Sequence, residues 1–207
     1  MNHLQEVTHL SNTYYALRHG RSLANRADLI VSNPADGVAE YGLADEGRAQ
    51  VAKAVEEAKQ QYGLDRSTLI VSSDFARARE TAEIAARLLG VREIVTMPQL
   101  RERFFGAWDK QSTSNYQNVW RDDFTNPDHK HNGVESTSEV ISRTTALIRS
   151  LEETYSGRNI LLISHGDVLQ ILQTVFQRVP SSHHRLLSHL DTGEIRKLKL
   201  KASDDDS

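Results

Sequence analysis

The stretch Thr13-Tyr14-Tyr15-Ala16-Leu17-Arg18-His19-Gly20 is a short apolar run that ends in an arginine, a histidine and a glycine. Its length and its bounding glycine predict a strand over Thr13–Arg18. A second apolar run, Asn159–Ser164, is followed in the same way by His165-Gly166. Ligands of open α/β sheets bind beyond the carboxyl ends of the strands, which is where both histidines would lie.

Short apolar runs alternate with helical patterns along the rest of the chain. Further strands are predicted over Thr68–Ser72 and Glu93–Met97, and helices over about 45–62, 75–89, 137–156 and 167–178. Near the C-terminus, Arg185–Leu190 and Glu194–Leu200 flank Asp191-Thr192-Gly193 and predict a hairpin. Strands that alternate with helices of this length predict an α/β fold with a mainly parallel sheet covered on both faces.

The stretch 101–136 interrupts this alternation, because its aromatic residues are scattered among polar ones. A long aromatic insertion has two interpretations, a cap over the site or a packed surface excursion. At the two ends, residues 1–12 are predicted to be a loose leader and residues 203–207 a solvated acidic tail.

The composition is that of one globular domain spanning 1–207, with 38% hydrophobic and 26% charged residues. The net charge of −3 does not favour nucleic acid or an anionic membrane as a partner. The absence of cysteine excludes disulfides, thiolate metal sites and a cysteine nucleophile. No secretory signal or membrane-length apolar run is visible, so a cytoplasmic protein is expected.

The residues at the first strand end suit phosphate chemistry. Cleavage of a phosphate ester through histidine needs a neutral imidazole that attacks phosphorus and fixed positive charges that stabilise the phosphoryl oxygens. His19 is the candidate nucleophile, Arg18 can form two hydrogen bonds to phosphate oxygens, and Gly20 permits close backbone approach. The alternative is a packed histidine at a strand end.

Two further segments supply the other groups that this chemistry needs. Ser73–Ala82 follows a predicted strand and opens a helix, which places Arg77 in the first turn beside backbone N–H groups that favour anions. Glu102 follows the third strand and could give a proton to the leaving group. Alternatively, Arg77 is a surface arginine paired with Glu80 or Asp74, and Glu102 is an exposed glutamate flanked by two arginines.

Taken in order, these segments resemble the histidine phosphatase superfamily, in the branch named for cofactor-dependent phosphoglycerate mutase. The resemblance covers roughly residues 13–200. It rests on five segments in the family's order: Arg18-His19-Gly20-Arg21-Ser22 with Asn25, Ser73–Ala82, Leu100 with Glu102 and Gly106-Ala107-Trp108, Gly133-Val134-Glu135-Ser136, and Ser164-His165-Gly166-Asp167.

The resemblance implies a three-layer α/β/α sandwich with a mixed, mainly parallel sheet, and it assigns roles to individual residues. His19 would become phosphorylated, and Glu102 would donate the proton, with its pKa raised if a cap excludes water. The phosphate pocket would consist of Arg18, Asn25, Arg77 and His165. Arg21, Ser22 and Gly166 are further candidates for substrate contact. No metal and no cofactor are expected.

Departures from the mutase pattern favour a phosphatase. Dedicated mutases carry a tyrosine where this chain has Phe105, and paired arginines where Trp120-Arg121-Asp122 offers one. We therefore expect a metal-independent phosphomonoesterase that acts on a small phosphorylated metabolite, such as a sugar phosphate or bisphosphate. A phosphoglycerate mutase with the same chemistry is the alternative.

Other interpretations remain open from the sequence alone. Basic residues near the predicted site could recognise further negative charge or could be salt-bridged surface groups: Arg21, Arg101, Arg103, Lys110, Arg121 and Lys130. His165-Gly166-Asp167 and His129-Lys130-His131 could instead bind a metal, as in iron oxygenases. A non-catalytic module that binds phosphorylated ligands is a third reading, and both a monomer and a homodimer fit the sequence.

Overall fold

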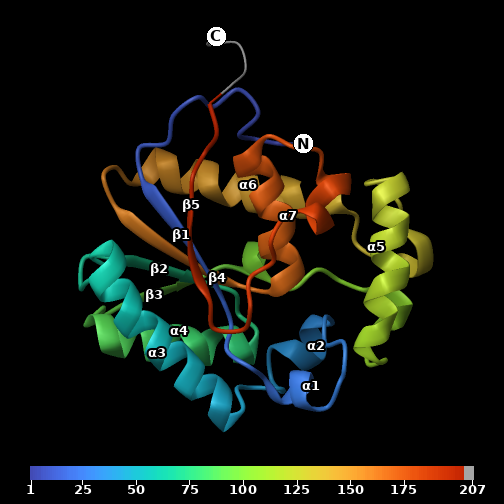
Figure 1. Ribbon diagram of the computed structural model, residues 1–207, viewed down its shortest axis with the longest axis horizontal. Helices are drawn as coiled ribbons and strands as arrows, with labels where there is room; N and C mark the ends of the chain where they lie inside the picture. The colour runs from blue at the N-terminus through green and yellow to red at the C-terminus, as the bar shows by residue number, and fades with distance from the viewer. Residues whose placement is uncertain (203–207) are drawn as a thin grey trace.

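The computed structural model describes residues 1–202. Its strands form one five-stranded sheet in the order β3-β2-β4-β1-β5 (Figure 1). Four strands run parallel, and β5 pairs antiparallel with β1. The strands are β1 (Thr13–Arg18), β2 (Leu69–Ser72), β3 (Ile94–Thr96), β4 (Asn159–Ser164) and β5 (Ile195–Leu198). The four predicted parallel strands are confirmed, and the predicted acidic tail lies outside the described residues.

Two pairs of helices cover the two faces of the sheet and make the three layers (Figure 1). One face carries α3 (Asp45–Tyr62) and α4 (Ala76–Leu89), and the other carries α6 (Thr137–Thr154) and α7 (Gly166–Gln177). All four helices begin and end within two residues of their predicted bounds. The predicted α/β/α sandwich is therefore confirmed.

The central strand β4 shows why the sequences of the strands are unbroken apolar runs. Ile160 and Leu162 belong to the core under α6 and α7, whereas Leu161 and Ile163 belong to the core under α3 and α4. Successive side chains of a strand point to opposite faces, and both faces here are covered by helices. The sequence of such a strand is hydrophobic at every position.

Short elements fill the connections between these layers. They are α1 (Leu23–Arg26), α2 (Pro34–Gly37), η1 (Pro98–Leu100), η2 (Gly106–Trp108), η3 (Thr113–Asn115), α5 (Tyr116–Thr125), η4 (His131–Gly133) and η5 (Ser181–Leu186). The stretch 101–136 thus contains one helix of full length, α5, which stands at the edge of the molecule beyond α7 (Figure 1).

The predicted terminal hairpin is wrong. Residues 181–186 form η5, and β5 pairs with β1, with Leu17 opposite Ile195 and Tyr14 opposite Leu198. The segment between them makes no strand because its carbonyls accept hydrogen bonds from side chains, at Leu187 from Gln170 and at Ser188 from Arg196.

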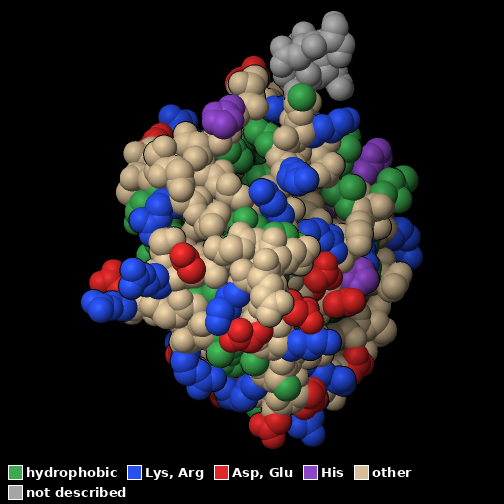
Figure 2. All heavy atoms as spheres, turned by 60° about the vertical axis from the view of Figure 1, so that its left-hand side comes forward, with side chains coloured by type: hydrophobic (Ala, Val, Ile, Leu, Met, Phe, Trp, Pro, Cys, Tyr) green, Lys and Arg blue, Asp and Glu red, His purple; other side chains and the backbone are tan. Residues whose placement is uncertain are grey.

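The surface carries both signs of charge, as expected from 25 basic and 28 acidic residues in the sequence. On the face shown in Figure 2, Lys and Arg side chains are interspersed with Asp and Glu side chains. Within residues 1–202, every helix is too short or too polar to cross a bilayer.

Candidate active site

The topology brings the two His-Gly pairs together. β1 and β4 are parallel neighbours with Arg18 opposite Ser164, so His19 and His165 leave the sheet side by side. The backbone N–H of His19 donates to the Ser164 carbonyl at 3.0 Å, and the two imidazole rings lie edge to face with 5.1 Å between centroids. The juxtaposition predicted from the strand ends is present.

The loop after β1 fixes the orientation of the His19 ring. His19 Nδ1 lies 2.8 Å from the carbonyl oxygen of Gly20, and because a carbonyl only accepts, Nδ1 carries the proton. A Cβ at Gly20 would lie 2.4 Å from the Gly47 carbonyl of α3, so only glycine permits this close approach. The lone pair of His19 is therefore on Nε2.

Arg77 joins the two histidines. Its Nε donates to His19 Nε2 at 3.1 Å and to His165 Nδ1 at 3.2 Å, while one terminal nitrogen donates to the Val31 carbonyl at 3.0 Å. Burial, together with the charges of Arg77 and Arg18, holds the pKa of His19 well below 6.5. Burial and the charge of Arg77 lower the pKa of His165 in the same way.

His165 is therefore also a neutral imidazole. Its Nε2 lies 2.9 Å from Ser73 Oγ, and its Nδ1 receives the Arg77 hydrogen bond, so the ring proton is on Nε2. Ser73 directly follows β2 and its backbone N–H donates to the Ile163 carbonyl at 2.9 Å. Three adjacent strand ends thus supply the centre of the site.

Two guanidinium nitrogens in this centre have no hydrogen-bond partner within residues 1–202. They are Arg18 Nε and Arg77 Nη1, both shielded from solvent. Arg18 is anchored by an Nη1 bond of 2.8 Å to the Leu190 carbonyl. A Cβ at Gly166 would lie 3.0 Å from Arg18 Cζ, so glycine lets the guanidinium pack against the start of α7. Buried charged donors without partners are costly unless an anion binds them.

Glu102 completes the set of predicted catalytic groups. The pKa of Glu102 is raised to about 7, mainly by burial. The charge of Arg77 opposes this rise, and the charge of Asp167 adds to it. One carboxylate oxygen accepts the Arg103 backbone N–H at 3.0 Å. Glu102 and Arg18 line the same cavity, of about 530 Å³. The expected rise in the pKa of Glu102 is confirmed.

Three further predicted residues occupy the loop after β1. Ser22 and Asn25 form a capping box at the start of α1, in which Asn25 Oδ1 accepts the Ser22 N–H at 3.0 Å, and Asn25 also lines the cavity. Arg21 is exposed, lies 3.6 Å from Glu46 of α3, and does not line the cavity. Its side chain extends toward Glu46 of α3, and its contact with substrate stays a prediction.

Most of the other basic residues considered for substrate binding form ion pairs instead. Arg101 bonds Asp74 at 2.5 Å, Lys110 lies 2.7 Å from Asp36, and Lys130 lies 2.5 Å from Glu139.

Arg103 has a structural environment that its sequence position did not reveal. It is 0% exposed, bonds both oxygens of Asp123 at 2.7 Å, and reaches Asp167 at 3.2 Å. Trp120 donates its indole N–H to Asp167 Oδ1 at 2.8 Å. This buried network ties α5 to the start of α7, and Trp120, Asp167 and Arg185 also line the cavity.

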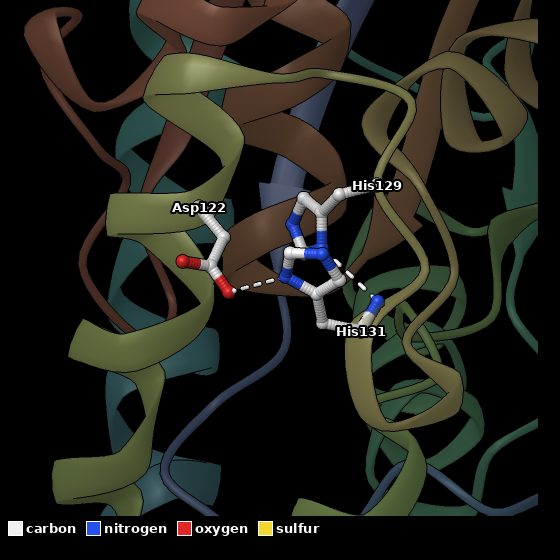
Figure 3. A group of neighbouring side chains, drawn as sticks. All are labelled: Asp122, His129 and His131. Carbon is white, nitrogen blue, oxygen red and sulfur yellow. Dashed lines mark hydrogen bonds and ion pairs between the residues drawn. The ribbon is translucent and has the colours of Figure 1, made fainter.

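The second candidate metal motif lies near the far end of α5. One ligand atom from each of Asp122, His129 and His131 lies within 4.8 Å of the others (Figure 3). Asp122 pairs with His131 Nδ1 at 3.0 Å, the His131 N–H donates to His129 Nδ1 at 3.4 Å, and His129 Nε2 bonds Asp123 at 2.8 Å. None of the three lines the cavity.

The hypothesis that His165 and Asp167 bind iron, as in iron oxygenases, does not fit the contacts that these side chains make. Both ring nitrogens of His165 bond protein groups, one of them a guanidinium, and Asp167 is bound to Arg103 and Trp120. A cation would have to displace these partners beside a fixed positive charge.

Comparison with known proteins identifies the family of this chain. Residues 14–205 match the family described as histidine phosphatase superfamily (branch 1). The chain belongs to the histidine phosphatase superfamily. Within it, the chain is 30% identical over 178 residues to the "Probable phosphoglycerate mutase GpmB" of Escherichia coli O139:H28, across 84% of this chain and 78% of that protein.

Solved structures show the same superfamily fold. A mycobacterial glucosyl-3-phosphoglycerate phosphatase in complex with VO3 superposes with a TM-score of 0.71 at 23% identity, over 92% of this chain and 99% of that one. Bacillus stearothermophilus YhfR gives a TM-score of 0.70 at 22% identity, over 93% and 95% of the two chains. At these identities the likeness concerns the fold.

Proposed function

We propose that this protein is a metal-independent phosphomonoesterase that forms a phosphohistidine on His19 and acts on a small phosphorylated metabolite. One observation carries the proposal. The buried, neutral His19 has its lone pair on Nε2, beside two guanidinium groups whose shielded donors Arg18 Nε and Arg77 Nη1 lack partners within residues 1–202. A phosphoryl group supplies both an electrophile for the imidazole and acceptors for these donors.

The first step transfers the phosphoryl group to the imidazole. His19 Nε2 gives up its hydrogen bond from Arg77, attacks phosphorus, and forms the P–N bond as the P–O bond to the leaving group breaks. The departing oxygen takes the electron pair of that bond and receives the proton of Glu102. The leaving group therefore departs as an alcohol. Arg18 and Arg77 bind the phosphoryl oxygens throughout.

The second step returns the site to its starting state. Glu102, now a carboxylate, takes a proton from water as the water oxygen attacks phosphorus. The P–N bond breaks, its electron pair returns to Nε2, and inorganic phosphate leaves. His165 binds a phosphoryl oxygen through Nδ1 only when Nδ1 carries a proton. A bound dianion favours this protonated form of His165.

The insertion 101–136 is part of this proposal as a cap. Tyr116, Gln117 and Trp120 of α5 line the cavity opposite the strand ends. Asn25 lies in the cavity wall as a phosphate-pocket residue, and Ser22 supports it through the capping box. Water exclusion by these groups supports the raised pKa of Glu102.

Phosphatase rather than mutase activity is favoured by Phe105. This residue, at the position of the mutase tyrosine, is 0% exposed and packs on Tyr116 with 4.7 Å between ring centroids. It therefore offers the cavity no hydroxyl for a phosphoglycerate carboxylate. The mutase-like name of the relative keeps mutase activity as the second candidate.

The test is hydrolysis of alkyl phosphates in H2¹⁸O with EDTA present. A phosphatase releases phosphate that carries ¹⁸O, whereas a mutase returns the phosphoryl group to an added phosphoglycerate acceptor. His19→Gln should lose at least about a thousandfold in kcat, and the exposed variant His9→Gln should not. Retained phosphate binding without turnover of any monoester would instead support a binding module.

A further inference from the structure

Arg185 brings a third guanidinium to the cavity that holds Arg18. It belongs to η5, after α7, and its Cζ lies 3.6 Å from the centroid of the Trp120 ring of α5. Both side chains line the cavity. Two segments that are distant in sequence therefore build one part of the cavity lining.

The Arg185 guanidinium is held in a defined orientation. Trp120 is fixed by its indole bond to Asp167 and by stacking with Tyr116, at 5.3 Å between centroids and 12° between planes. Arg185 Nη1 donates to Gln170 Oε1, and Gln170 in turn donates to the Leu187 carbonyl at 2.6 Å. A stacked, planar guanidinium loses little freedom when it binds an anion.

This guanidinium also has no counter-ion among residues 1–202. No carboxylate of residues 1–202 lies within 4.0 Å of Arg185, and the same holds for Arg18. Asp167, the acid whose charge acts on Arg185, is already bound to Arg103 and Trp120. By contrast, Arg101 and Arg103 of the insertion are paired with carboxylates.

The charge of Arg18 acts on Arg185. Arg185 is exposed at its surface, and its partial burial lowers its pKa, the charge of Asp167 raises it, and the charge of Arg18 lowers it. Solvent screens part of the repulsion between these two charges, and a ligand with two anionic groups would offset the rest.

We propose that Arg185 binds a second anionic group of the substrate, in the same cavity as the phosphate that lies between Arg18 and Arg77. This inference rests on the proposed function and adds the substrate class: a phosphate monoester with a carboxylate or second phosphate at its other end. Thr113, Ser114 and Gln117 also line this cavity, and their polar groups suit a hydroxylated linker. The second anion is recognised from the segment after α7.

The experiment uses alkyl phosphates of increasing chain length that end in a hydroxyl, a carboxylate or a phosphate. At the chain length that spans the cavity, the wild type should show kcat/KM about 10- to 100-fold higher for an anionic end than for a hydroxyl end. The carboxylate and phosphate arms show which anion is preferred. Arg185→Gln should abolish the preference, and Arg185→Lys should restore part of it.

A matched control comes from the neighbouring helix. Arg121 of α5 is exposed and does not line the cavity, so Arg121→Gln should keep the full preference. Trp120→Phe, which loses the indole bond to Asp167, should weaken the preference more than it weakens hydrolysis of the hydroxyl-ended ester. Equal loss for all three end groups in Arg185→Gln would show a structural role and overturn the inference.

Two readouts separate this inference from the proposed function. Calorimetric binding of the matching non-hydrolysable phosphonates measures end-group preference without turnover, and a wild type without preference overturns the inference. His19-dependent hydrolysis of an aryl phosphate reports on the proposed function alone. Aryl phosphatase activity without end-group preference would therefore leave the phosphatase standing and remove the role of Arg185.

Discussion

Glu102→Gln separates the charge of this side chain from its shape. Burial raises the pKa of Glu102 from the ordinary 4.5 to about 7. At about 1.4 kcal/mol per pH unit, the ionised form is about 3 kcal/mol less favourable in the folded protein than in the unfolded chain. The folded protein keeps this proton up to about pH 7, whereas the unfolded chain loses it near 4.5. Stability from this group is therefore lost as the pH rises between these values.

Urea unfolding measures this loss directly. Glutamine cannot ionise, and its Oε1 can still accept the Arg103 N–H. The compared quantity is the unfolding free energy of Glu102→Gln minus that of wild type. This difference should be about 2–3 kcal/mol larger at about pH 8 than at about pH 5. Glu57→Gln, at an exposed position of α3, controls for the loss of one surface carboxylate.

The same variant tests the proton-donor role. Hydrolysis of an alkyl phosphate should fall by about a hundred- to ten-thousandfold, whereas an aryl phosphate with a good leaving group should be affected much less. Wild-type activity on the alkyl ester should decline above about pH 7, as Glu102 loses its proton. A stability difference that does not change with pH would refute the reasoning, because Glu102 would then ionise like any surface glutamate.

Three further predictions follow from the other groups of the site. Arg103→Met leaves Asp123 and Asp167 buried without their cation and should cost about 3–5 kcal/mol in urea unfolding; a loss below about 1 kcal/mol would contradict the buried ion pair. Gly166→Ala pushes a Cβ against Arg18 and should weaken vanadate inhibition about tenfold, with unchanged circular dichroism; unchanged inhibition would show that Arg18 does not bind the oxyanion. Phosphate binding should take up a proton at His165, seen as buffer-dependent binding heat in wild type but not in His165→Gln, and equal heats in all buffers would exclude it.

Much of the candidate site could be predicted from sequence because it follows a topological rule. His19, Ser73 and His165 each come directly after a parallel strand, and such strands end at one edge of a sheet. Arg77 lies one turn further, at the start of α4. Their convergence therefore needed only the strand order, which alternating strands and helices already restrict.

The environment of the charged residues could not be predicted in this way. Arg103 stands between Glu102 and Phe104, where the sequence left it either a substrate contact or a salt-bridged surface group. It is instead buried and paired with Asp123 and Asp167, which lie far along the chain. Whether an arginine is free or paired depends on tertiary contacts that no local pattern records.

The wall built by η5 was missed for a related reason. Residues 185–190 precede the turn Asp191-Thr192-Gly193 and so resemble one arm of a hairpin, but side chains of α7 and β5 take the carbonyls that a strand would use. Arg185 consequently lies over Trp120 instead of in a hairpin. Pairing β5 with β1 required the edge of β1 to be open, which only the assembled sheet reveals.

The position of the phosphoryl group on the ring of His19 is the most direct test of the account. Because Nδ1 donates to the Gly20 carbonyl, the phosphoenzyme should carry phosphorus on Nε2. Rapid quenching at alkaline pH after mixing with substrate, followed by ³¹P NMR and peptide mass spectrometry, distinguishes the two ring isomers and locates the residue. An acid-labile Nε2 adduct on His19, absent from His19→Gln, is the expected result. Phosphorus on Nδ1, on another residue, or retained in His19→Gln would contradict the central claim.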